Sequence, residues 1–442
     1  MTNGDEFQRM TEHPPQGRRI KVLMLSWEYP PVLVGGLGRH VHALATRLAR
    51  AGHEVTVATR HAPGAALDEM VDGVRVVRAP EDPPRIPLDT PHLLAWTMAF
   101  NHTLTRTALR ATAGEHYDLV HAHDWLVTHA AVTMRHHLGV PMVATVHATE
   151  VGRHQGWLAG DLSRSIHSVE WWLGREATRV LVCSEYMRNE VTALFGLPAD
   201  RIEVIPNGVD LPLWKATPAQ VRSARATFAG PGPLIGFAGR LVHEKGVQHL
   251  LNAVPRLRRQ HGDVRVVIAG DGPHRAELET AARRLGIASS VTFAGFLGPA
   301  LPSTMACTDA MVVPSLYEPF GLVALEAAAA GAPLAVSATG GLAEIVRPGV
   351  TGVTFPAADD AALAEAVGMQ LGDRGGALRM ARAAGLMVRR RFGWDSVAER
   401  TAEIYERVVS EPATLGPPEP ETTAAPVPAD DANLLAAAGL LV

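Results

Sequence analysis

The chain has 442 residues, of which 47% are hydrophobic and 19% are charged, and its formal net charge is −4. It is too long for one ordinary hydrophobic core, because single cores stop growing at about 250–300 residues, so two large domains are expected. The charge balance gives no electrostatic reason to expect a nucleic acid as a partner. The two cysteines, Cys183 and Cys307, lie in apolar contexts without a metal or redox spacing, which predicts buried free thiols.

The two ends differ in composition from the rest. Residues 1–18 are polar and contain no apolar segment of signal-peptide length, and no run approaches the roughly 18 apolar residues of a membrane-spanning helix. We therefore expect a disordered N-terminus over 1–18 and a cytoplasmic protein. The segment 411–442 is rich in Pro, Ala and acidic residues, which predicts a disordered tail whose last residues, NLLAAAGLLV, either dock or trail.

Strands and helices alternate through the first half of the chain. The apolar run 20–26 (IKVLMLS) is a predicted strand, and after WEYPP the glycine loop GGLG precedes a helix with an apolar face. That face consists of Val41, Leu44, Ala45 and Leu48. The later elements are the strands HEVTVAT, GVRVVRA, DLVHAHD, PMVATVHA, RVLVCSE and RIEVIPNG, with helices around 92–113 and 127–138.

A second series of the same kind begins with the strand LIGFAG. Its following helix has an apolar face made of Val247, Leu250, Leu251, Val254 and Leu257. Further on come the strands VRVVIAG, SVTFAGF, AMVVPSL, PLAVSAT and GVTF, a helix at 274–285, a short helix, and the helix that holds Glu326. Strands that are apolar throughout and joined by helices predict parallel sheets covered on both faces. The fold class is therefore α/β, with Rossmann-like domains at 19–207 and 208–393 and a ligand cleft between them.

Two carboxylates stand in the apolar stretch SLYEPFGLVALEAAAAG. Pro319 disfavours helix at the residue before it, so Glu318 belongs to a loop, whereas Glu326 lies inside a helix that starts near Gly321. That helix has apolar residues on almost every side, so an ionised Glu326 needs a hydrogen-bonding partner. The free amides at its start, residues 320–322, favour an anion such as phosphate. Helix capping and an ion pair with arginine would explain the same two residues without a ligand.

Two further loops stand at predicted strand ends. In GFAGRLVHEKG, Arg240 and Lys245 could clamp a diphosphate, although a solvated basic loop would have the same sequence pattern. In VLVGGLGRH, Gly35, Gly36 and Gly38 allow a ligand to approach the backbone at a helix start, as would a plain tight turn. This loop does not fit the dinucleotide-binding fingerprint.

Histidines also follow predicted strands. DLVHAHDW contains His121, His123 and Asp124, and PMVATVHATE contains His147 and Glu150. Metal binding by His121 and His123 would need a third ligand, and the sequence places none, so no metal site is predicted.

These elements, in this order, resemble the retaining glycosyltransferases of the GT-B architecture, in the large family that contains glycogen synthases and sucrose-, trehalose- and mannosyl-transferring relatives (glycosyltransferase family 4). The resemblance covers about 20–410 and rests on the Glu-x7-Glu pattern, the Arg/Lys pair, PNGVD and the Gly-Gly loop. SWEYPPVLVGGLGRHV, HAHDW and HATEVGRHQGW are most similar to actinobacterial glycogen-synthase-like α-1,4-glucosyltransferases.

The resemblance implies a role for each matching residue. Glu326 would hold the ribose hydroxyls of a nucleotide and Glu318 would face the donor sugar. Arg240 and Lys245 would bind the diphosphate. The amides of Phe320, Gly321 and Leu322 would share that charge, and Gly36 would approach it from the first domain. His147 would hydrogen-bond the reacting sugar, Asp124 would line the acceptor side, and the helix at 394–410 would cross back to the first domain.

The implied function is a hexosyltransferase that transfers glucose from ADP- or UDP-glucose to an α-1,4-glucan or related oligosaccharide. No cofactor or metal is expected. Val34 stands where bacterial ADP-glucose-dependent glycogen synthases usually have Lys, which leaves the nucleotide open. Within the family, a maltose-1-phosphate synthase or a lipid or small-molecule mannosyltransferase are alternatives. From other classes, a nucleotide-sugar epimerase or a non-catalytic sensor would share the donor site. Nothing in the sequence specifies an oligomeric state.

Overall fold

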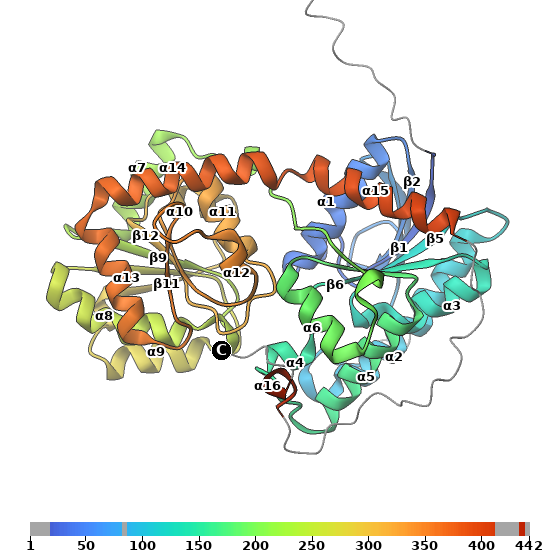
Figure 1. Ribbon diagram of the computed structural model, residues 1–442, viewed down its shortest axis with the longest axis horizontal. Helices are drawn as coiled ribbons and strands as arrows, with labels where there is room; N and C mark the ends of the chain where they lie inside the picture. The colour runs from blue at the N-terminus through green and yellow to red at the C-terminus, as the bar shows by residue number, and fades with distance from the viewer. Residues whose placement is uncertain (1–17, 82–85, 412–432, 438–442) are drawn as a thin grey trace, which may run out of the picture.

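Two α/β domains lie side by side in this computed structural model, which describes residues 18–81, 86–411 and 433–437 (Figure 1). In both domains helices cover the two faces of a central sheet. The two sheets fall on either side of the predicted boundary at 207/208, since the first ends at Val204 and the second begins at Leu234. The α/β fold class with two Rossmann-like domains is confirmed.

The N-terminal sheet has eight strands in the order β3-β4-β2-β1-β5-β6-β7-β8. Its strands are β1 (Lys21–Leu25), β2 (Glu54–Arg60), β3 (Asp68–Val71), β4 (Val74–Ala79), β5 (Leu119–His123), β6 (Met142–Val146), β7 (Arg179–Val182) and β8 (Ile202–Val204). All neighbours pair in parallel except β3 and β4, which pair antiparallel. The expectation of purely parallel sheets is wrong at this edge. Asp72 and Gly73 both have positive φ, which allows the two-residue hairpin that joins these strands.

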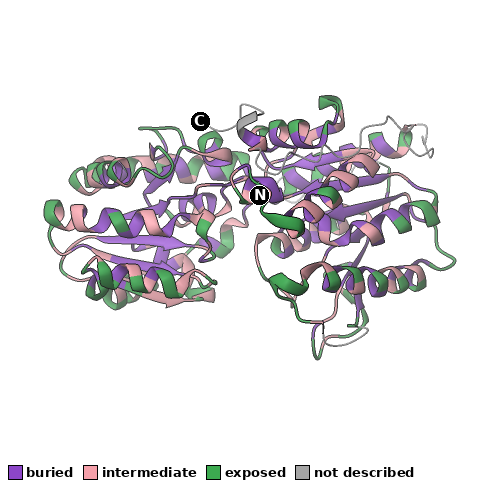
Figure 2. Ribbon diagram, turned by 90° about the horizontal axis from the view of Figure 1, so that it is seen from below, coloured by how far each residue is buried: buried purple, intermediate pink, exposed green. Residues whose placement is uncertain are grey.

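The C-terminal sheet has six parallel strands in the order β11-β10-β9-β12-β13-β14. Its strands are β9 (Leu234–Ala238), β10 (Arg265–Ala269), β11 (Val291–Gly295), β12 (Ala310–Val313), β13 (Leu334–Ser337) and β14 (Val353–Phe355). The residues of β9 and β12 are all buried, as expected for central strands covered on both faces (Figure 2).

Helices connect the strands and cover the sheets. They are α1 (Gly36–Arg50), α2 (Leu93–Thr112), α3 (Thr128–Leu138), α4 (Glu150–Arg153), α5 (Gly160–Glu176) and α6 (Glu185–Phe195) in the N-terminal half, and α7 (Pro218–Phe228), α8 (Val247–His261), α9 (Arg275–Arg284), α10 (Leu301–Ala306), α11 (Leu322–Ala330), α12 (Gly340–Ile345), α13 (Asp360–Gly372) and α14 (Arg374–Arg391) in the C-terminal half. The helices expected around 92–113, 127–138 and 274–285 correspond to α2, α3 and α9. Among the described residues, no helix is both long and apolar enough to cross a membrane.

The last long helix returns to the first domain. The chain leaves α14 at Phe392, whose carbonyl accepts a hydrogen bond from the amide of Val209 (2.8 Å), and α15 (Trp394–Ser410) then packs on α1 (Figure 1). The buried face of α15 recurs at helical spacing through Val397, Thr401, Ile404, Tyr405 and Val408. The predicted crossing helix is therefore present, and it joins the two domains a second time.

The ends of the chain lie mostly outside the described residues, as do most of the segments expected to be disordered. Within the described part, α16 (Leu434–Ala437) packs near α4, and the amide of Leu434 donates to the carbonyl of Gly156 (2.8 Å). The last residues were expected either to dock or to trail, and Leu435 is buried against the N-terminal domain, so the described part of this segment docks. Cys183 and Cys307 are free and buried, as predicted.

Candidate active site

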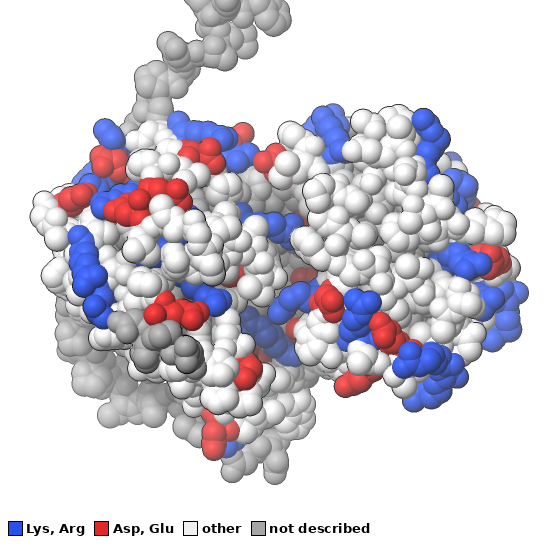
Figure 3. Space-filling model, turned by 180° about the vertical axis from the view of Figure 1, so that it is seen from behind, with Lys and Arg blue, Asp and Glu red and all other residues white. Residues whose placement is uncertain are grey.

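The loops at the carboxyl ends of the strands of both domains meet across a groove. From the C-terminal domain come the loops after β9, β12 and β13, and from the N-terminal domain the loops after β1, β5, β6 and β7. Viewed from behind, the surface is hollowed between the domains, with basic and acidic side chains along the hollow (Figure 3). Parallel α/β sheets bind ligands at this edge, so the candidate site lies here.

A separate hollow of about 440 Å³ lies at the opposite edge of the C-terminal sheet. Its Arg225 and Asp309 are paired with each other, since Arg225 donates to Asp309 (2.7 Å) and also to the carbonyl of Cys307 (2.8 Å). Because the amino ends of β9 and β12 point here, this hollow is not the candidate site.

The two predicted cations follow β9. Lys245 ends a short 3₁₀ helix (His243–Lys245), and its Nζ donates to Glu318 Oε2 at 2.8 Å, while Ser315 Oγ donates to the same oxygen at 3.1 Å. Arg240 is half exposed, and its nearest acidic partner is Glu244 at 3.9 Å. Of the two cations expected at the diphosphate, Lys245 is therefore held in place by the Glu318 carboxylate, whereas Arg240 is only loosely held.

The loop before α11 is built as the sequence predicts. Glu318 lies outside the helix, and Gly321, with φ 108°, begins it. A Cβ at Gly321 would overlap Leu342 of α12, so both the backbone angle and the close packing require glycine. The amides at the start of α11, around Phe320 and Leu322, have no helical carbonyl to accept their hydrogen bonds. This end of the helix therefore favours an anion.

Glu326 is buried in α11 and pairs with a residue of the other domain. Arg39 Nη1 of α1 donates to Glu326 Oε1 at 2.8 Å. Burial nevertheless raises the pKa of Glu326 to about 7, since the half-exposed guanidinium only partly offsets the loss of hydration. The hydrogen-bonding partner expected for this carboxylate is thus an arginine of the other domain.

We expect this carboxyl group to make stability depend on pH. Its native pKa of about 7 exceeds its ordinary value of 4.5, so the folded state binds more protons between these values and stability falls as pH rises through them. Glu326→Gln has no proton to lose, and its stability relative to the wild type should rise by up to about 3 kcal/mol between pH 4.5 and pH 8. Urea unfolding across this range measures the difference. Glu365→Gln, on the exposed face of α13, should follow the wild type, and a constant gap for Glu326→Gln would contradict the assignment.

The glycine loop is held by a buried glutamate. Glu28 Oε2 accepts hydrogen bonds from the amides of Val34 (2.8 Å) and Gly35 (3.0 Å). A Cβ at Gly36 would come within 3.0 Å of Leu322 Cδ1 at the start of α11. The first domain therefore comes close to the start of α11 at this glycine, and the role of Gly36 at a diphosphate stays a prediction.

Tyr317 joins the loop 314–321, named the donor loop after the role that the resemblance implies, to the loop after β6 that begins at His147, named the histidine loop. Its phenol donates to Glu190 Oε1 (2.8 Å) and accepts from the amide of Thr149 (3.2 Å), so a side chain of the C-terminal domain is buried in the N-terminal one. Gly152 of α4 makes room, because a Cβ there would overlap the Tyr317 ring. Ser184 Oγ also donates to the carbonyl of Pro319 at 2.6 Å. The donor loop is thus anchored on both sides of Glu318.

His147 follows β6 and is positioned by Asp124. Asp124 Oδ1 accepts from the His147 amide at 2.8 Å, and Asp124 has φ 63° and ψ 172°, a region that few residues other than glycine adopt. Burial lowers the pKa of His147 to about 4, with Arg153 contributing, and burial raises the pKa of Asp124 to about 6. The buried carboxyl group of Asp124 holds the histidine loop, and its acceptor-side role stays a prediction.

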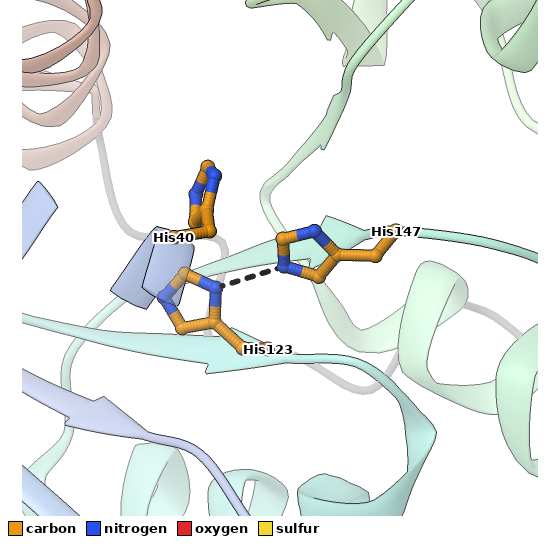
Figure 4. A group of neighbouring side chains, drawn as sticks. All are labelled: His40, His123 and His147. Atoms are coloured by element: carbon orange, nitrogen blue, oxygen red, sulfur yellow. Dashed lines mark hydrogen bonds between the residues drawn. The ribbon is translucent and has the colours of Figure 1, made fainter. Parts of the chain in front are cut away.

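Three histidines come together at this point. His147 Nε2 lies 3.3 Å from His123 Nδ1, and His40 of α1 completes a group whose ligand nitrogens all lie within 4.8 Å of one another (Figure 4). His121, in contrast, is bonded through both nitrogens, to Tyr405 (2.6 Å) and Thr145 (2.8 Å). The sequence could not place a third histidine beside the strand-end pair, whereas the fold brings His40 of helix α1 next to His123 and His147.

Sequence reasoning missed five residues of this site: Glu28, Arg39, His40, Gly152 and Tyr317. All five stand inside motifs that had been noticed, so proximity to a motif was the available signal. Glu28 bonds to amides six and seven residues further on, whereas the partners of the other four lie far away in sequence and only the folded chain brings them together.

Two Rossmann-like domains facing one groove, with cations and a helix start on one side and a histidine on the other, define the GT-B class. Residues 34–212 match the family described as Glycosyltransferase Family 4, and residues 222–385 match Glycosyl transferases group 1. Glycogen synthase of Mycobacterium tuberculosis (strain ATCC 25618 / H37Rv) is 45% identical over 398 residues, covering 87% of this chain and 94% of that protein.

Two other similar proteins differ in what their names say they act on or bind. A D-inositol 3-phosphate glycosyltransferase of Nocardia farcinica is 34% identical over 404 residues, covering 85% of this chain and 86% of that one. The catalytic domain of starch synthase IV from Arabidopsis thaliana, solved with ADP and acarbose, has the same fold, with a TM-score of 0.72 at 20% identity over 89% of this chain and all of that one. The chain belongs to the GT-B glycosyltransferase family that includes glycogen synthase, and it is a glycosyltransferase.

Proposed function

We propose that the protein transfers glucose, with retention of configuration, from ADP- or UDP-glucose to an α-1,4-glucan or related oligosaccharide. The observation that carries this proposal is the arrangement of the strand-end loops at the groove. Lys245 contacts Glu318 just before α11, Gly36 of the other domain approaches the start of α11, and Arg240 lies on the same loop as Lys245. The similarity to a glycogen synthase over nearly the whole chain supports glucose and glucan as the substrates. A cytoplasmic location remains a prediction of the sequence.

In the proposed reaction, groups in the groove stabilise the leaving diphosphate while the acceptor hydroxyl attacks the sugar. Negative charge grows on the diphosphate as the glycosidic bond breaks, and Arg240, Lys245 and the helix amides stabilise that charge. The acceptor hydroxyl attacks from the face that the diphosphate leaves, and a diphosphate oxygen takes its proton, so no protein nucleophile is assigned. Lys245 and Arg240 supply the charge that a metal ion supplies elsewhere, and we propose turnover without added metal.

Glu318 and Glu326 take different parts of the donor. Glu318 lies beside Lys245, and we propose that the sugar attached to the bound diphosphate lies next to it and is met by His147 of the other domain. Glu326 lies deeper in α11 and pairs with Arg39, and we propose that the ribose hydroxyls share or replace that pairing. Val34, at the position of the usual lysine, is half exposed and brings no charge to the donor.

A donor and acceptor panel tests the function. ADP-, UDP- and GDP-glucose and GDP-mannose are each incubated with maltooligosaccharides, with glucose 1-phosphate and with no acceptor, and the products are measured by mass. We expect hexose addition to maltooligosaccharides from ADP- or UDP-glucose. Maltose 1-phosphate would identify the alternative synthase, mannose transfer the mannosyl branch, and an altered sugar nucleotide without acceptor an epimerase. Turnover with no donor would overturn the proposal.

A further inference from the structure

His40, His123 and His147 come from three elements that are distant in sequence: helix α1, the end of β5 and the loop after β6 (Figure 4). Their rings surround one point, with centroids 4.7 Å apart for His40 and His147, 5.7 Å for His40 and His123, and 5.6 Å for His123 and His147. His40 and His123 are buried, whereas His147 is partly exposed. The group is therefore enclosed on the protein side and accessible at His147.

Core packing does not account for these rings. His40 Nδ1 is buried without a hydrogen-bonding partner among the described residues, and so is His123 Nε2, the ring nitrogen of His123 that does not face His147. A buried polar atom without a partner costs about 1–3 kcal/mol, and such atoms in native structures call for an explanation by a ligand, an ion or a function. His121, one residue from His123 on the same strand, shows how the fold treats a structural histidine, since both of its nitrogens are bonded.

We propose that His40, His123 and His147 bind one divalent transition-metal ion of the Zn²⁺ class, with the fourth coordination position open to the groove. Three imidazole nitrogens suit Zn²⁺, Co²⁺ or Ni²⁺, whereas Mg²⁺ and Ca²⁺ prefer oxygen ligands. Tetrahedral ligands at about 2.0–2.1 Å from zinc lie roughly 3.3 Å apart. His123 Nδ1 and His147 Nε2 already lie 3.3 Å apart, and the ligand nitrogens of all three residues lie within 4.8 Å of one another.

The surroundings support the same assignment. His40 is hydrogen-bonded to the side chain of Asn207, the kind of second partner that orients a metal-binding imidazole. The Trp394 ring lies against His40 at a centroid distance of 5.2 Å and shields it from the other side. The bonds formed are dative, so no group is oxidised or reduced.

The ion would block the transferase reaction. Binding engages His147, which the proposed function places at the reacting sugar, and the charge on the diphosphate is already met by Arg240 and Lys245. This second part of the inference rests on the proposed function, whereas binding itself does not. The expected consequence is inhibition by Zn²⁺ that a chelator reverses.

Binding is tested on the full chain without a histidine tag, stripped of metal and titrated with Zn²⁺ by calorimetry. We expect one ion per chain, and a dissociation constant raised at least about tenfold in both His40→Gln and His123→Gln. His102→Gln, on an exposed position of α2, should bind as the wild type does. Co²⁺ should give the visible absorption of a tetrahedral nitrogen site in the wild type, a readout independent of how the variants fold. No Zn²⁺ binding by the wild type, or unchanged binding by both variants, would overturn the site.

Inhibition is tested separately with the donor and acceptor that support turnover. Wild-type turnover should fall at Zn²⁺ concentrations that saturate the site and recover with EDTA, whereas His40→Gln, compared with its own metal-free rate, should resist the same concentrations. Stoichiometric binding with unchanged turnover would overturn the blocking role and leave the site standing. Zinc binding by a chain that turns over no donor would refute the proposed function, not the metal site.

Discussion

Replacing Lys245 by Ala is expected to lower turnover by a factor on the order of 10² to 10³, as does removing a group that stabilises charge in a transition state. Lys245 is the cation that the structure fixes, since its Nζ lies 2.8 Å from Glu318. Arg240→Ala should have an effect of the same order, because this half-exposed side chain has only a distant acidic partner and is free to turn toward a diphosphate. Steady-state kinetics with the active donor measure both, and kcat should fall more than KM rises if the charge is met in the transition state.

The Lys245 variant needs a control for folding. Its loss leaves the buried Glu318 carboxylate with the Ser315 hydroxyl as its remaining side-chain partner among the described residues, and an unpaired buried charge is strongly destabilising. The double variant Lys245→Met/Glu318→Gln removes that charge, so it should recover stability without recovering turnover. Lys215→Ala, at an exposed position outside the groove loops, should behave as the wild type. Full turnover by Lys245→Ala or Arg240→Ala would remove that residue from the proposed donor site.

Gly152→Ala is expected to disrupt the contact between the two domains. The added methyl group would overlap the Tyr317 ring, which is buried and bonded to Glu190 and Thr149. Overpacking of this kind costs about 1–3 kcal/mol in the free energy of unfolding. Because Tyr317 directly precedes Glu318, its displacement also moves the donor loop, and a shift of about 1 Å can lower turnover by as much as 10²-fold. Thermal unfolding and kcat measure the two effects.

A second substitution separates the overlap from other causes. In a Tyr317→Ser background the ring is gone, so Gly152→Ala should cost little further stability, and the two substitutions should be non-additive. Gly372→Ala, at the end of α13, meets no atom within 4 Å and should be close to neutral. Equal costs of Gly152→Ala in both backgrounds would show that the Tyr317 contact is not the reason for the glycine.

Features that depend on neighbouring residues could be predicted from the sequence, whereas features that depend on how strands pair could not. Apolar strands, helical periodicity and the turn signals at Pro319 and Gly321 are local properties, so both domains, the loop position of Glu318 and the helical position of Glu326 were predictable. The antiparallel strand β3 was missed because DEMV is short and only half buried, and its pairing depends on a hairpin.

The sequence alone determined the architecture, the family resemblance and the identity of the donor-loop residues, because these depend on neighbours within a few turns or strands. Only the tertiary structure decided which distant side chains meet: Arg39 with Glu326, Tyr317 with Gly152, and His40 with His123 and His147. Each of these pairings joins residues from separate elements or domains, and none follows a local periodicity from which it could be predicted. The partner of the buried carboxylate in α11 was required by the cost of burying a charge, but its identity had to come from the fold.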